Sequence, residues 1–488
     1  MSAMLETIIG LEVHAQIRTK TKLFCSCPNG AWDAPPNTTV CPICMGHPGT
    51  LPVPNAEALR KAICTSLALG CTIAPQCHFD RKHYFYPDLP SGFQISQYDF
   101  PLAKHGHVDY DLYENSGKPL KQQRCRIHRL HVENDAGKLT HVGCTTLCDY
   151  NRAGTPLMEI VTEPDLRSAE EAVAFAQELR RILLAVDASE ADIFKGMMRF
   201  DASISLREQG TEKLNPRSEI KNLNSFKALE KALQYEENRL RDAWEKSGGP
   251  LPGNITVGWL DDAGRTRLLR EKEDAQDYRY FPEPDIPPMA FETSDLETIK
   301  AALPPLPKAQ REAYVKLGLE EASALQLLGD PILKNLFDAL YAQTQDAKLV
   351  AGILLTQLLG FLNAAGKTTA DTPSTEHLRA LVEAIQTGTI SKNSGKALLE
   401  QMVQTGQDPH TLMAKNNMQQ VSDAAVLERL VKDAIAANPD AVASFKKGKT
   451  TALGAIVGFV MKQSKGQANP GMVNELMLKS LQAEKLKS

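Results

Sequence analysis

The sequence predicts an α+β protein, in which a domain with a mixed or antiparallel sheet is followed by a helical domain and a helical tail. The first 290 or so residues mix strand-like alternation with a few strong helices. A proline-rich stretch follows, and beyond it the patterns are almost wholly helical. With 488 residues, the chain is too long for one core and implies about two to four domains.

The N-terminal part contains three stretches in which every second side chain is apolar, as in a half-buried strand. They cover residues 8–17, 127–133 and 200–206. In the first of them, one face holds Leu11, Val13, Ala15 and Ile17, and the other holds Glu12, His14 and Gln16. Because most polar strand faces meet water, this pattern alone does not distinguish a solvated face from one that meets a substrate.

Two helices are predicted in the same part of the chain. Ser168 and Glu171 form the pattern of a capping box at the start of a helix that extends to about residue 186. A second helix is expected from about residue 225 to 245, ending at Gly248 and Gly249. The prolines within 282–288 and 304–307 predict a linker or hinge, because proline removes a backbone donor and fixes φ. Residues 349–359 and 378–385 lack strand alternation and are expected to be helical.

Composition indicates a cytoplasmic protein with no membrane association. The charged fraction is 23%, the N-terminus lacks the pattern of a signal peptide, and no apolar run reaches the roughly 18–20 residues that cross a bilayer. The net charge of −4 argues against a protein that coats nucleic acid indiscriminately. From residue 441 onward, however, eight lysines face only two glutamates. This basic segment either contacts a polyanion or is a solvated surface.

Ten cysteines without a signal peptide suggest a reducing compartment, with metal-binding or buried thiols. Cys25 and Cys27 form one close pair, and Cys41 and Cys44 form a second pair in a C-P-x-C turn. Four thiolates in two pairs are typical of a structural zinc site, whereas the alternative is four unligated thiols. The other six cysteines show no such pattern and are expected to be packing residues: Cys64, Cys71, Cys77, Cys125, Cys144 and Cys148.

Carboxylates recur on polar strand faces and beside turns: Glu12 near His14, Glu133 near Asp135, and Asp201. Such oxygen-rich groups suit Mg²⁺, which takes one or two carboxylates together with substrate phosphates, but each residue taken singly is more often a solvated charge. The Gly-Lys-Thr stretches at 366–368 and 448–450 lack the upstream glycine of a P-loop, so any nucleotide is held in another way. The aromatic residues within 81–98 and 278–282 either stack on a base or fix a loop.

These segments together resemble the GatB/GatE family of tRNA-dependent amidotransferase subunits over essentially the whole chain. The matching motifs include G-L-E-V-H-A-Q at 10–16, C-S-C…C-P-I-C at 25–44, R-K-H-Y-F-Y-P-D-L-P at 81–90, Q-I-S-Q-Y-D-F-P at 94–101 and H-V-E-N-D-A-G-K at 131–138. Further matches are N-R-A-G-T-P-L-M-E-I-V-T-E-P-D at 151–165, E-I-K-N-L-N-S-F at 219–226 and D-Y-R-Y-F-P-E-P-D at 277–285.

The resemblance implies one member of an ATP-dependent, glutamine-hydrolysing aminoacyl-tRNA amidotransferase, a heterotrimer whose other two components are an amidase and a small third protein. The implied reaction is phosphorylation of the side-chain carboxylate of Glu-tRNA(Gln) or Asp-tRNA(Asn), followed by attack of ammonia channelled from the amidase. The products are Gln-tRNA(Gln) and Asn-tRNA(Asn) for translation. The resemblance also implies a catalytic cradle over 1–293, a helical domain over 294–412 and a YqeY-like tRNA-binding tail over 413–488.

Carried over by position, the resemblance implies site residues that the local patterns leave undecided. The implied catalytic residues are Glu12, His14, Lys82, Tyr84, Glu133 and Asp201, and the implied Mg²⁺ ligands are Glu12, His14, Glu133, Asn134 and Asp201. Lys82 and Tyr84 match positions near the ammonia path and the reacting carboxylate. The implied tRNA contacts are Lys446, Lys447, Lys449, Lys462 and Lys465.

This chain departs from the family pattern at two of these places. The family usually has a second glutamate where this chain has Asn134, so one negative charge is missing, and its R-C-D-A-N reads R-F-D-A-S at 199–203. Some family members lack the four cysteines, which fits a structural Zn²⁺. The competing hypothesis is a zinc-stabilised, non-catalytic tRNA-binding module, which would need the lysines but not Glu12, His14 or Asp201.

Overall fold

The computed structural model describes residues 4–30, 33–114, 119–272, 278–416, 424–446, 453–464 and 470–485. The chain divides into two compact units, residues 1–310 and 311–488, and each is described by itself. The domain boundaries expected at 293 and 412 stay predictions.

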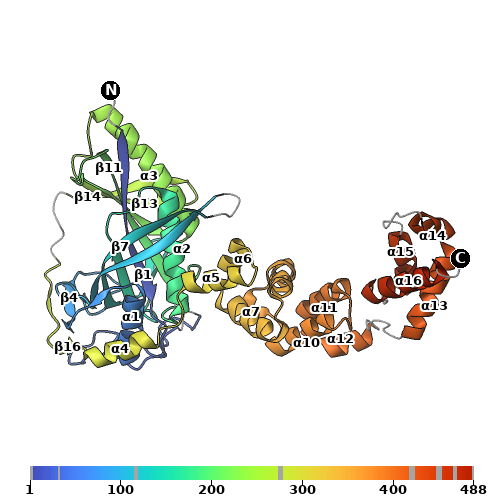
Figure 1. Ribbon diagram of the computed structural model, residues 1–488. Coiled ribbons are helices and arrows are strands. Elements are labelled where there is room, and N and C mark those ends of the chain that lie inside the picture. Colours follow the sequence, from blue (N-terminus) through green and yellow to red (C-terminus); the bar gives the residue numbers. More distant parts are fainter. Residues whose placement is uncertain are drawn as a thin grey trace. The chain divides into compact units, whose positions relative to one another are not determined.

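The first unit is built on a nine-stranded sheet (Figure 1). In spatial order its strands are β14 (Arg265–Lys272), β13 (Asn254–Leu260), β12 (Ser218–Leu223), β11 (Met198–Glu208), β1 (Leu5–Gln16), β10 (Pro156–Thr162), β7 (Pro119–Asn134), β6 (Ala103–Tyr113) and β2 (Thr72–Ile73). All neighbours are antiparallel except β12 and β13, which run parallel. The sheet is therefore mixed, and the predicted α+β class is confirmed. The strands predicted at 127–133 and 200–206 lie within β7 and β11, and the one predicted at 8–17 corresponds to β1, which ends at Gln16.

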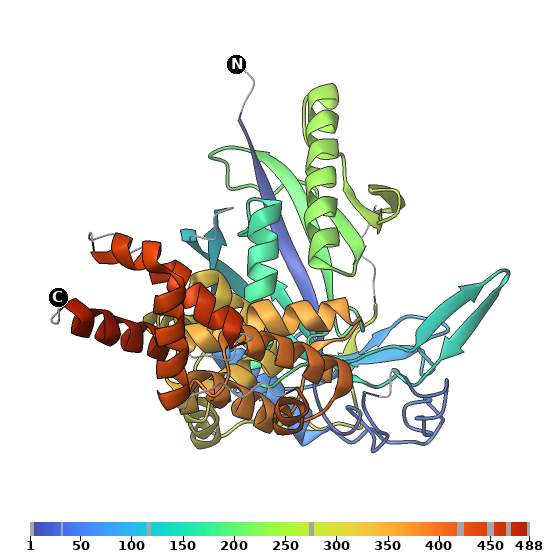
Figure 2. The ribbon, with the colours of Figure 1, turned by 90° about the vertical axis from the view of Figure 1, so that its right-hand side faces the viewer.

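Two long helices, α2 (Ala169–Ala185) and α3 (Phe226–Ser247), lie side by side on one face of this sheet (Figures 1 and 2). The apolar residues of β1 point toward this layer and are fully buried, with Leu11 1% and Val13 0% exposed. Because successive side chains of a strand alternate, Glu12 and His14 must then lie on the opposite face. The hydrophobic core therefore fixes which face of the sheet carries the polar side chains.

Both predicted helices begin and end near the expected residues. The hydroxyl of Ser168 accepts a hydrogen bond from the Glu171 N–H at 3.2 Å. The Glu171 carboxylate accepts from the backbone N–H of Arg167 at 2.8 Å, one residue before the partner expected in a capping box. Helix α3 begins after Ser225 and ends at Gly248, whose φ of 74° is left-handed, as a glycine at this position allows.

The proline-rich segment at 282–288 is not a linker, which corrects the prediction. Residues Phe281–Pro282 form β15 on the edge of a small sheet with β4 (Asp80–His83) and β5 (Phe93–Ser96). Glu283 is buried and accepts two hydrogen bonds from the Arg81 guanidinium, at 2.7 and 2.8 Å. Proline is compatible with this pairing because β15 is an edge strand of two residues. A second pairing joins β16 (Met289–Ala290) to β3 (Gln76–Cys77).

The remaining elements of the first unit are two helices and a hairpin. They are α1 (Ala56–Ala68), α4 (Thr293–Ala301), and β8 (Lys138–Val142) paired with β9 (Thr145–Asp149). The hairpin extends away from the sheet (Figure 2). Cys144 lies in its turn and is exposed, so the expectation that it packs in the interior is wrong, because the hairpin has no layer over it. Cys64, Cys71, Cys77 and Cys125 are buried, as predicted, and Cys148 is half-buried.

The described part of the second unit is helical. Its elements are α5 (Pro307–Lys316, which begins in the first unit), α6 (Glu321–Leu328), α7 (Pro331–Thr344), α8 (Ala347–Ala351), the π-helical η1 (Gly352–Leu358), α9 (Leu359–Ala364), the 3₁₀ turn η2 (Thr369–Asp371), α10 (Thr375–Gln386), α11 (Lys392–Thr405), α12 (Pro409–Lys415), α13 (Ala424–Ala437), α14 (Pro439–Lys446), α15 (Leu453–Gln463) and α16 (Pro470–Lys485). One apolar cluster extends from Tyr314 to Met413, and a second joins residues of α13 to α16.

Within the described residues, one helical stretch, Ala347–Ala364, is long and apolar enough to cross a membrane by length and composition. It comprises α8, η1 and α9. Val350, Leu354 and Leu358 of this stretch are fully buried in the larger cluster of the second unit. Its apolar side chains thus contribute to a folded core, which accounts for the high apolar content of this stretch.

Candidate active site and metal centre

The polar face of the sheet is assembled by strand register. In the pairing of β1 with β11, Glu12 lies opposite Asp201, and in the pairing of β1 with β10, His14 lies opposite Glu159. Opposed residues of antiparallel strands project on the same face within about 4.5–5.5 Å of each other. Strands that are distant in sequence therefore bring a row of carboxylates and histidines together on the face away from α2 and α3.

A histidine and two carboxylates form the densest group on this face. The Nε2 atom of His14 lies 3.2 Å from Glu159 Oε2 and 3.8 Å from Glu133 Oε1. One ligand atom from each of the three residues lies within 4.8 Å of the others. The Ser96 hydroxyl donates a hydrogen bond to Glu133 Oε2 at 2.9 Å, which fixes the orientation of that carboxylate. The group has the donor atoms and the compactness of a metal site.

The opposite charges of the histidines and glutamates in this group determine their protonation states. Burial alone lowers the pKa of His14, but the hydrogen bond to Glu159 and the charges of Glu159 and Glu133 outweigh it and raise the pKa to about 9. Burial alone raises the pKa of Glu159, yet the charges of His131 and His14 hold it well below the ordinary value. Against the effect of burial, hydrogen bonding and charge from His131 likewise lower the pKa of Glu133, so the two carboxylates are ionised.

Lys82 adds a positive charge beside the same group. Burial opposes its charge, but Glu133 and Glu159 raise the pKa of its ammonium. The Lys82 Nζ atom lies 5.1 Å from the ring centroid of Tyr278 and 6.0 Å from that of Tyr84. These rings screen the lysine from water. Lys82 is therefore a charged group that lies beside the carboxylates and packs against two tyrosine rings.

A second group of carboxylates surrounds Glu12. Lys221 Nζ lies 2.8 Å from Asp201 Oδ2 and 2.7 Å from Glu219 Oε1. Burial raises the pKa of Glu12, and the charges of Glu159, Asp201 and Glu219 raise it further. The register of β11 with β12 shifts beside Asp201, and Asn222 there has a left-handed φ of 69°. A register shift of this kind is a β-bulge. It changes the direction in which side chains point and is common next to active sites.

Asn134 is hydrogen-bonded to β5 through both its side chain and its backbone carbonyl. Its side-chain oxygen accepts a hydrogen bond from the backbone N–H of Ile95 at 2.8 Å, and its carbonyl accepts one from Gln94 at 2.9 Å. The adjacent Asp135 is bound by Arg199, with both carboxylate oxygens 3.0 Å from its Nη2, and by Gln16 at 3.2 Å. The structure thus brings Glu12, His14, Glu133, Asp201, Lys82 and Tyr84 to one region of the sheet, but Asn134 is engaged by β5.

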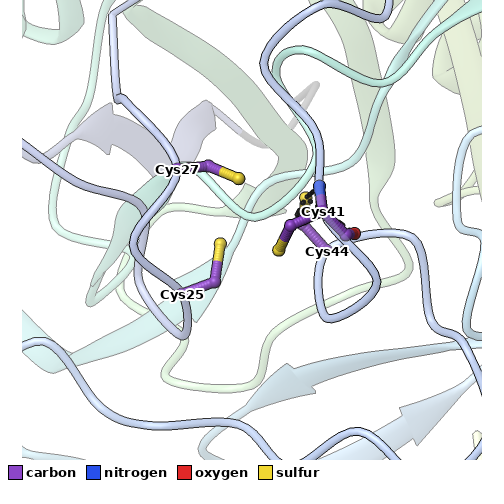
Figure 3. Close-up of side chains that lie close together, drawn as sticks. All are labelled: Cys25, Cys27, Cys41 and Cys44. Carbon is purple, nitrogen blue, oxygen red and sulfur yellow. Dashed lines mark hydrogen bonds between the residues drawn. The ribbon is translucent and has the colours of Figure 1, made fainter.

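The four cysteines at 25–44 form a separate cluster (Figure 3). Their sulfur atoms all lie within 4.8 Å of one another, and those of Cys41 and Cys44 are 3.9 Å apart. The thiol of Cys25 and, less strongly, the nearby Lys22 ammonium lower the pKa of Cys44. Four sulfurs converging from two turns fit a tetrahedral metal site, so the donor set agrees with the sequence prediction.

A cavity of about 330 Å³ lies between the cysteine loop and the small sheet. Its walls include Cys44, Gly46, Arg81, Phe93 and Asp135. A Cβ atom on Gly46, whose φ is 65°, would lie 2.7 Å from the backbone of Ser91. The cysteine loop therefore packs directly on the loop that follows Tyr84, and glycine is required there.

Several of the lysines expected to bind tRNA fall outside the described residues: Lys447, Lys449 and Lys465. Lys446 is the last residue of α14, and Lys462 lies exposed near the end of α15. Lys462 is thus accessible to a polyanion.

Sequence reasoning missed four members of the site: His131, Glu159, Glu219 and Lys221. His131 Nε2 lies 3.5 Å from Glu133 Oε2. Glu219 and Lys221 lie in the E-I-K motif at 219–221, which was used only for the family resemblance. Glu159 lies in a strand that is buried almost throughout, so no alternation of apolar residues marks it.

Comparison with known proteins matches both parts of the chain. The GatB/GatE catalytic domain matches residues 7–297, and a GatB domain matches residues 335–481. Proteins named as the B component of aspartyl/glutamyl-tRNA(Asn/Gln) amidotransferase are similar over nearly the full length. The one from Rippkaea orientalis is 42% identical over 98% of both chains, and the one from Persephonella marina is 43% identical over 97% of this chain and 98% of its own. That from Moorella thermoacetica is 42% identical over 98% of this chain and 99% of its own.

The α+β catalytic unit, its carboxylate-lined face and the helical C-terminal unit thus define the class of tRNA-dependent amidotransferase subunits. The chain belongs to the GatB/GatE family. The resemblance seen in the sequence is confirmed, and a non-catalytic binding module is not favoured.

Proposed function

We propose that this chain is the component that activates and amidates glutamate or aspartate carried by misacylated tRNA. ATP phosphorylates the side-chain carboxylate of Glu-tRNA(Gln) or Asp-tRNA(Asn), and ammonia then displaces phosphate to form the amide. The ammonia comes from a glutamine-hydrolysing amidase, which joins this chain and a small third protein in a heterotrimer. The products are Gln-tRNA(Gln) and Asn-tRNA(Asn).

The observation that carries this proposal is the convergence of two carboxylate groups, each with its own lysine, on one face of the sheet. His14, Glu133 and Glu159 lie within 4.8 Å of each other. Lys221 contacts Asp201 and Glu219 at 2.8 and 2.7 Å. Phosphoryl transfer needs mainly positioned positive charge around the transferred group, and carboxylates that hold cations supply it.

The residues fit Mg²⁺ as the ion of this site. We propose that Glu12, His14, Glu133, Glu159 and Asp201 hold it, and we leave out Asn134 because its side-chain oxygen accepts the Ile95 N–H. When bound, Mg²⁺ neutralises phosphate charge. A histidine ligand is unusual for Mg²⁺, and this imidazole, with a pKa of about 9, is charged at neutral pH. It must therefore lose its proton to ligate a metal.

The lysines and tyrosines have separate proposed roles. Lys82 and Lys221 each lie against carboxylates and are charged, so they can move onto phosphate oxygens as negative charge accumulates there. Tyr84 and Tyr278 line the approach to Lys82 and exclude water from the acyl phosphate, which water would otherwise hydrolyse.

The four-cysteine cluster is proposed to hold a structural Zn²⁺. A site closed by four thiolates has no open position for substrate, so its role is to fix the loop at 25–44. The division into a cradle over 1–293, a helical domain over 294–412 and a tRNA-binding tail over 413–488 is also part of the proposal. The tail contacts the tRNA through lysines that include Lys462.

The test is to assemble the three-protein complex and incubate it separately with Glu-tRNA(Gln) and Asp-tRNA(Asn), with glutamine, ATP and Mg²⁺. The amino acid released from each tRNA is then identified. Glutamine or asparagine that appears only when ATP is present supports the proposal. Amide formation that is independent of ATP, or that persists when this chain is omitted, would contradict it.

A further inference from the structure

Lys22 is a fully buried lysine beside the cysteine cluster. Its exposed fraction is 0%, and it is among the largest fully buried side chains. Within the described residues, no carboxylate lies within ion-pair distance of its ammonium, whose hydrogen-bond partners are two carbonyls and one sulfur. An isolated charge in a protein interior costs several kcal/mol. A negative charge close by would offset the cost of burying this ammonium.

The contacts of Lys22 lie at the cysteine cluster. Its Nζ atom donates to Cys44 Sγ at 3.6 Å, to the Thr39 carbonyl at 2.9 Å and to the Tyr150 carbonyl at 3.4 Å. Its backbone N–H donates to the Cys27 carbonyl at 3.0 Å. Lys22 thus contacts both cysteine pairs drawn in Figure 3, one through its backbone and one through its ammonium.

The surrounding backbone leaves room for this side chain. Gly154 has a φ of 86°, and a Cβ atom there would lie 3.4 Å from both Lys22 Cδ and Cys44 Cβ. Such a Cβ atom would be in van der Waals contact with both side chains, and the left-handed φ favours glycine at this position. The Gly154 carbonyl also accepts the backbone N–H of Leu23, which anchors the chain next to Lys22.

We propose that Lys22 is the counter-ion and positioning residue of a four-thiolate metal centre at Cys25, Cys27, Cys41 and Cys44. Four thiolates around a divalent ion have a net charge of −2, and one buried ammonium reduces it to −1. The N–H···S bond also orients Cys44, as groups that hydrogen-bond to metal ligands commonly do. This inference rests on the proposed structural metal site and is independent of the amidotransferase reaction.

The first test measures Zn²⁺ affinity of the full-length chain by competition with a chromogenic chelator under reducing conditions. Lys22→Met removes the charge at similar volume, and we expect it to weaken Zn²⁺ binding about 10- to 100-fold. Lys20→Met is the matched control, because Lys20 is an exposed lysine of the same segment, and its affinity should stay within about twofold of the wild type. In the Co²⁺-loaded protein, the sulfur-to-metal charge-transfer band should shift in Lys22→Met only. Unchanged Zn²⁺ affinity in Lys22→Met would overturn the proposal.

A second measurement separates the charge from simple packing. In a Cys44→Ala background the anionic partner is lost, so adding Lys22→Met should raise the metal-free unfolding midpoint by removing an uncompensated buried charge. In the Zn²⁺-loaded wild-type background, the same substitution should lower the midpoint. Equal destabilisation in both backgrounds would assign Lys22 to packing alone and overturn the proposal. If Lys22→Met does not fold by itself, its folding in the Cys44→Ala background supports the proposal, and its failure there contradicts it.

Discussion

Glu12 and Asp201 lie directly opposite each other on the paired strands β1 and β11, although 189 positions separate them in the sequence. Lys221 Nζ lies 2.8 Å from Asp201 Oδ2, so this pair of carboxylates has a cation beside it. The proposed phosphoryl-transfer site depends on this pairing of the two residues, because neither carboxylate alone distinguishes a reaction site from a solvated strand face.

Replacing Asp201 with Asn should abolish most of the reaction. The substitution keeps the shape but removes one charge that holds the cation, and we expect ATP-dependent amide formation in the three-protein complex to fall at least about 100-fold. The affinity for tRNA should stay within a few-fold. Asp109→Asn is the control, because Asp109 pairs with Arg124 at the far part of the sheet. Full turnover by the Asp201→Asn variant would show that the Asp201 carboxylate takes no part in the reaction.

Glu159 should contribute to the rate of the reaction as much as the residues that the sequence alone indicated. Glu159→Gln removes the negative charge 3.2 Å from His14 Nε2 and with it one of the two ionised carboxylates. We expect the release of ADP with Glu-tRNA(Gln) to fall at least tenfold. Glu163→Gln changes a more exposed glutamate a few residues further along the chain, which pairs with His128, and should leave the rate unchanged. Equal rates in the two variants would argue against a role for Glu159.

The ion pair of Asp165 with Arg126 should make a pH-dependent contribution to stability. Burial alone raises the pKa of Asp165, but hydrogen bonds from Arg126 lower it below the ordinary value. A lowered folded pKa means that stabilisation is present above about pH 4 and is lost as the pH falls through the folded value. We expect Asp165→Asn to lower the free energy of unfolding by about 1 kcal/mol at pH 7, by urea titration. The difference from wild type should shrink below about pH 4, and a constant difference would contradict the assignment.

The cysteine cluster should bind one metal ion per chain. Cys44→Ser removes one of four converging ligands, so the Zn²⁺ content of the purified chain should fall to near zero. Cys144→Ser is the matched control, since that thiol is exposed in the turn of the β8–β9 hairpin. Metal content should be determined by atomic emission after chelation of loosely bound ions. Equal Zn²⁺ in both variants would exclude Cys44 as a ligand.

Truncation after Lys415 should separate tRNA binding from partner activity. The larger apolar cluster of the second unit ends at Met413, so it is retained, whereas α13 to α16 are removed. We expect weaker tRNA binding in a filter-binding assay, while the amidase partner still releases ammonia from glutamine at the normal rate. Unchanged tRNA affinity would show that the tail is dispensable for binding.

Much of the fold could be predicted because local chemistry and tertiary packing agree. The alternation around Glu12 and His14 predicted both the strand and its polar face, and the capping pattern at Ser168 predicted where α2 begins. The parallel pairing of β12 with β13 left no local signal, since register depends on contacts between distant segments. The pairing of Phe281–Pro282 with β4 was missed for the same reason.

The site was predicted only in part. The alternation of side chains places Glu133 and Asp201 in predicted strands, whereas Glu159 becomes informative only once the β1–β10 register sets it opposite His14. Asn134 matches a family position, and its role as a ligand stays a prediction; its side-chain oxygen accepts the Ile95 N–H. A backbone donor on a strand far away along the chain cannot be read from a motif.

The bidentate contact between Arg81 and Glu283 also has a consequence for biosynthesis. The two residues are 202 positions apart, and the segment that Glu283 anchors carries Tyr278 toward Lys82. At about 5–20 residues per second, a ribosome takes roughly 10–40 s to reach Glu283 after it has made Arg81. During that interval the edge of the nascent β4 lacks its partner strand β15, and Lys82 lacks the neighbouring ring of Tyr278. The emerging chain is thus unable to assemble this reaction centre until more than half of the protein has been translated.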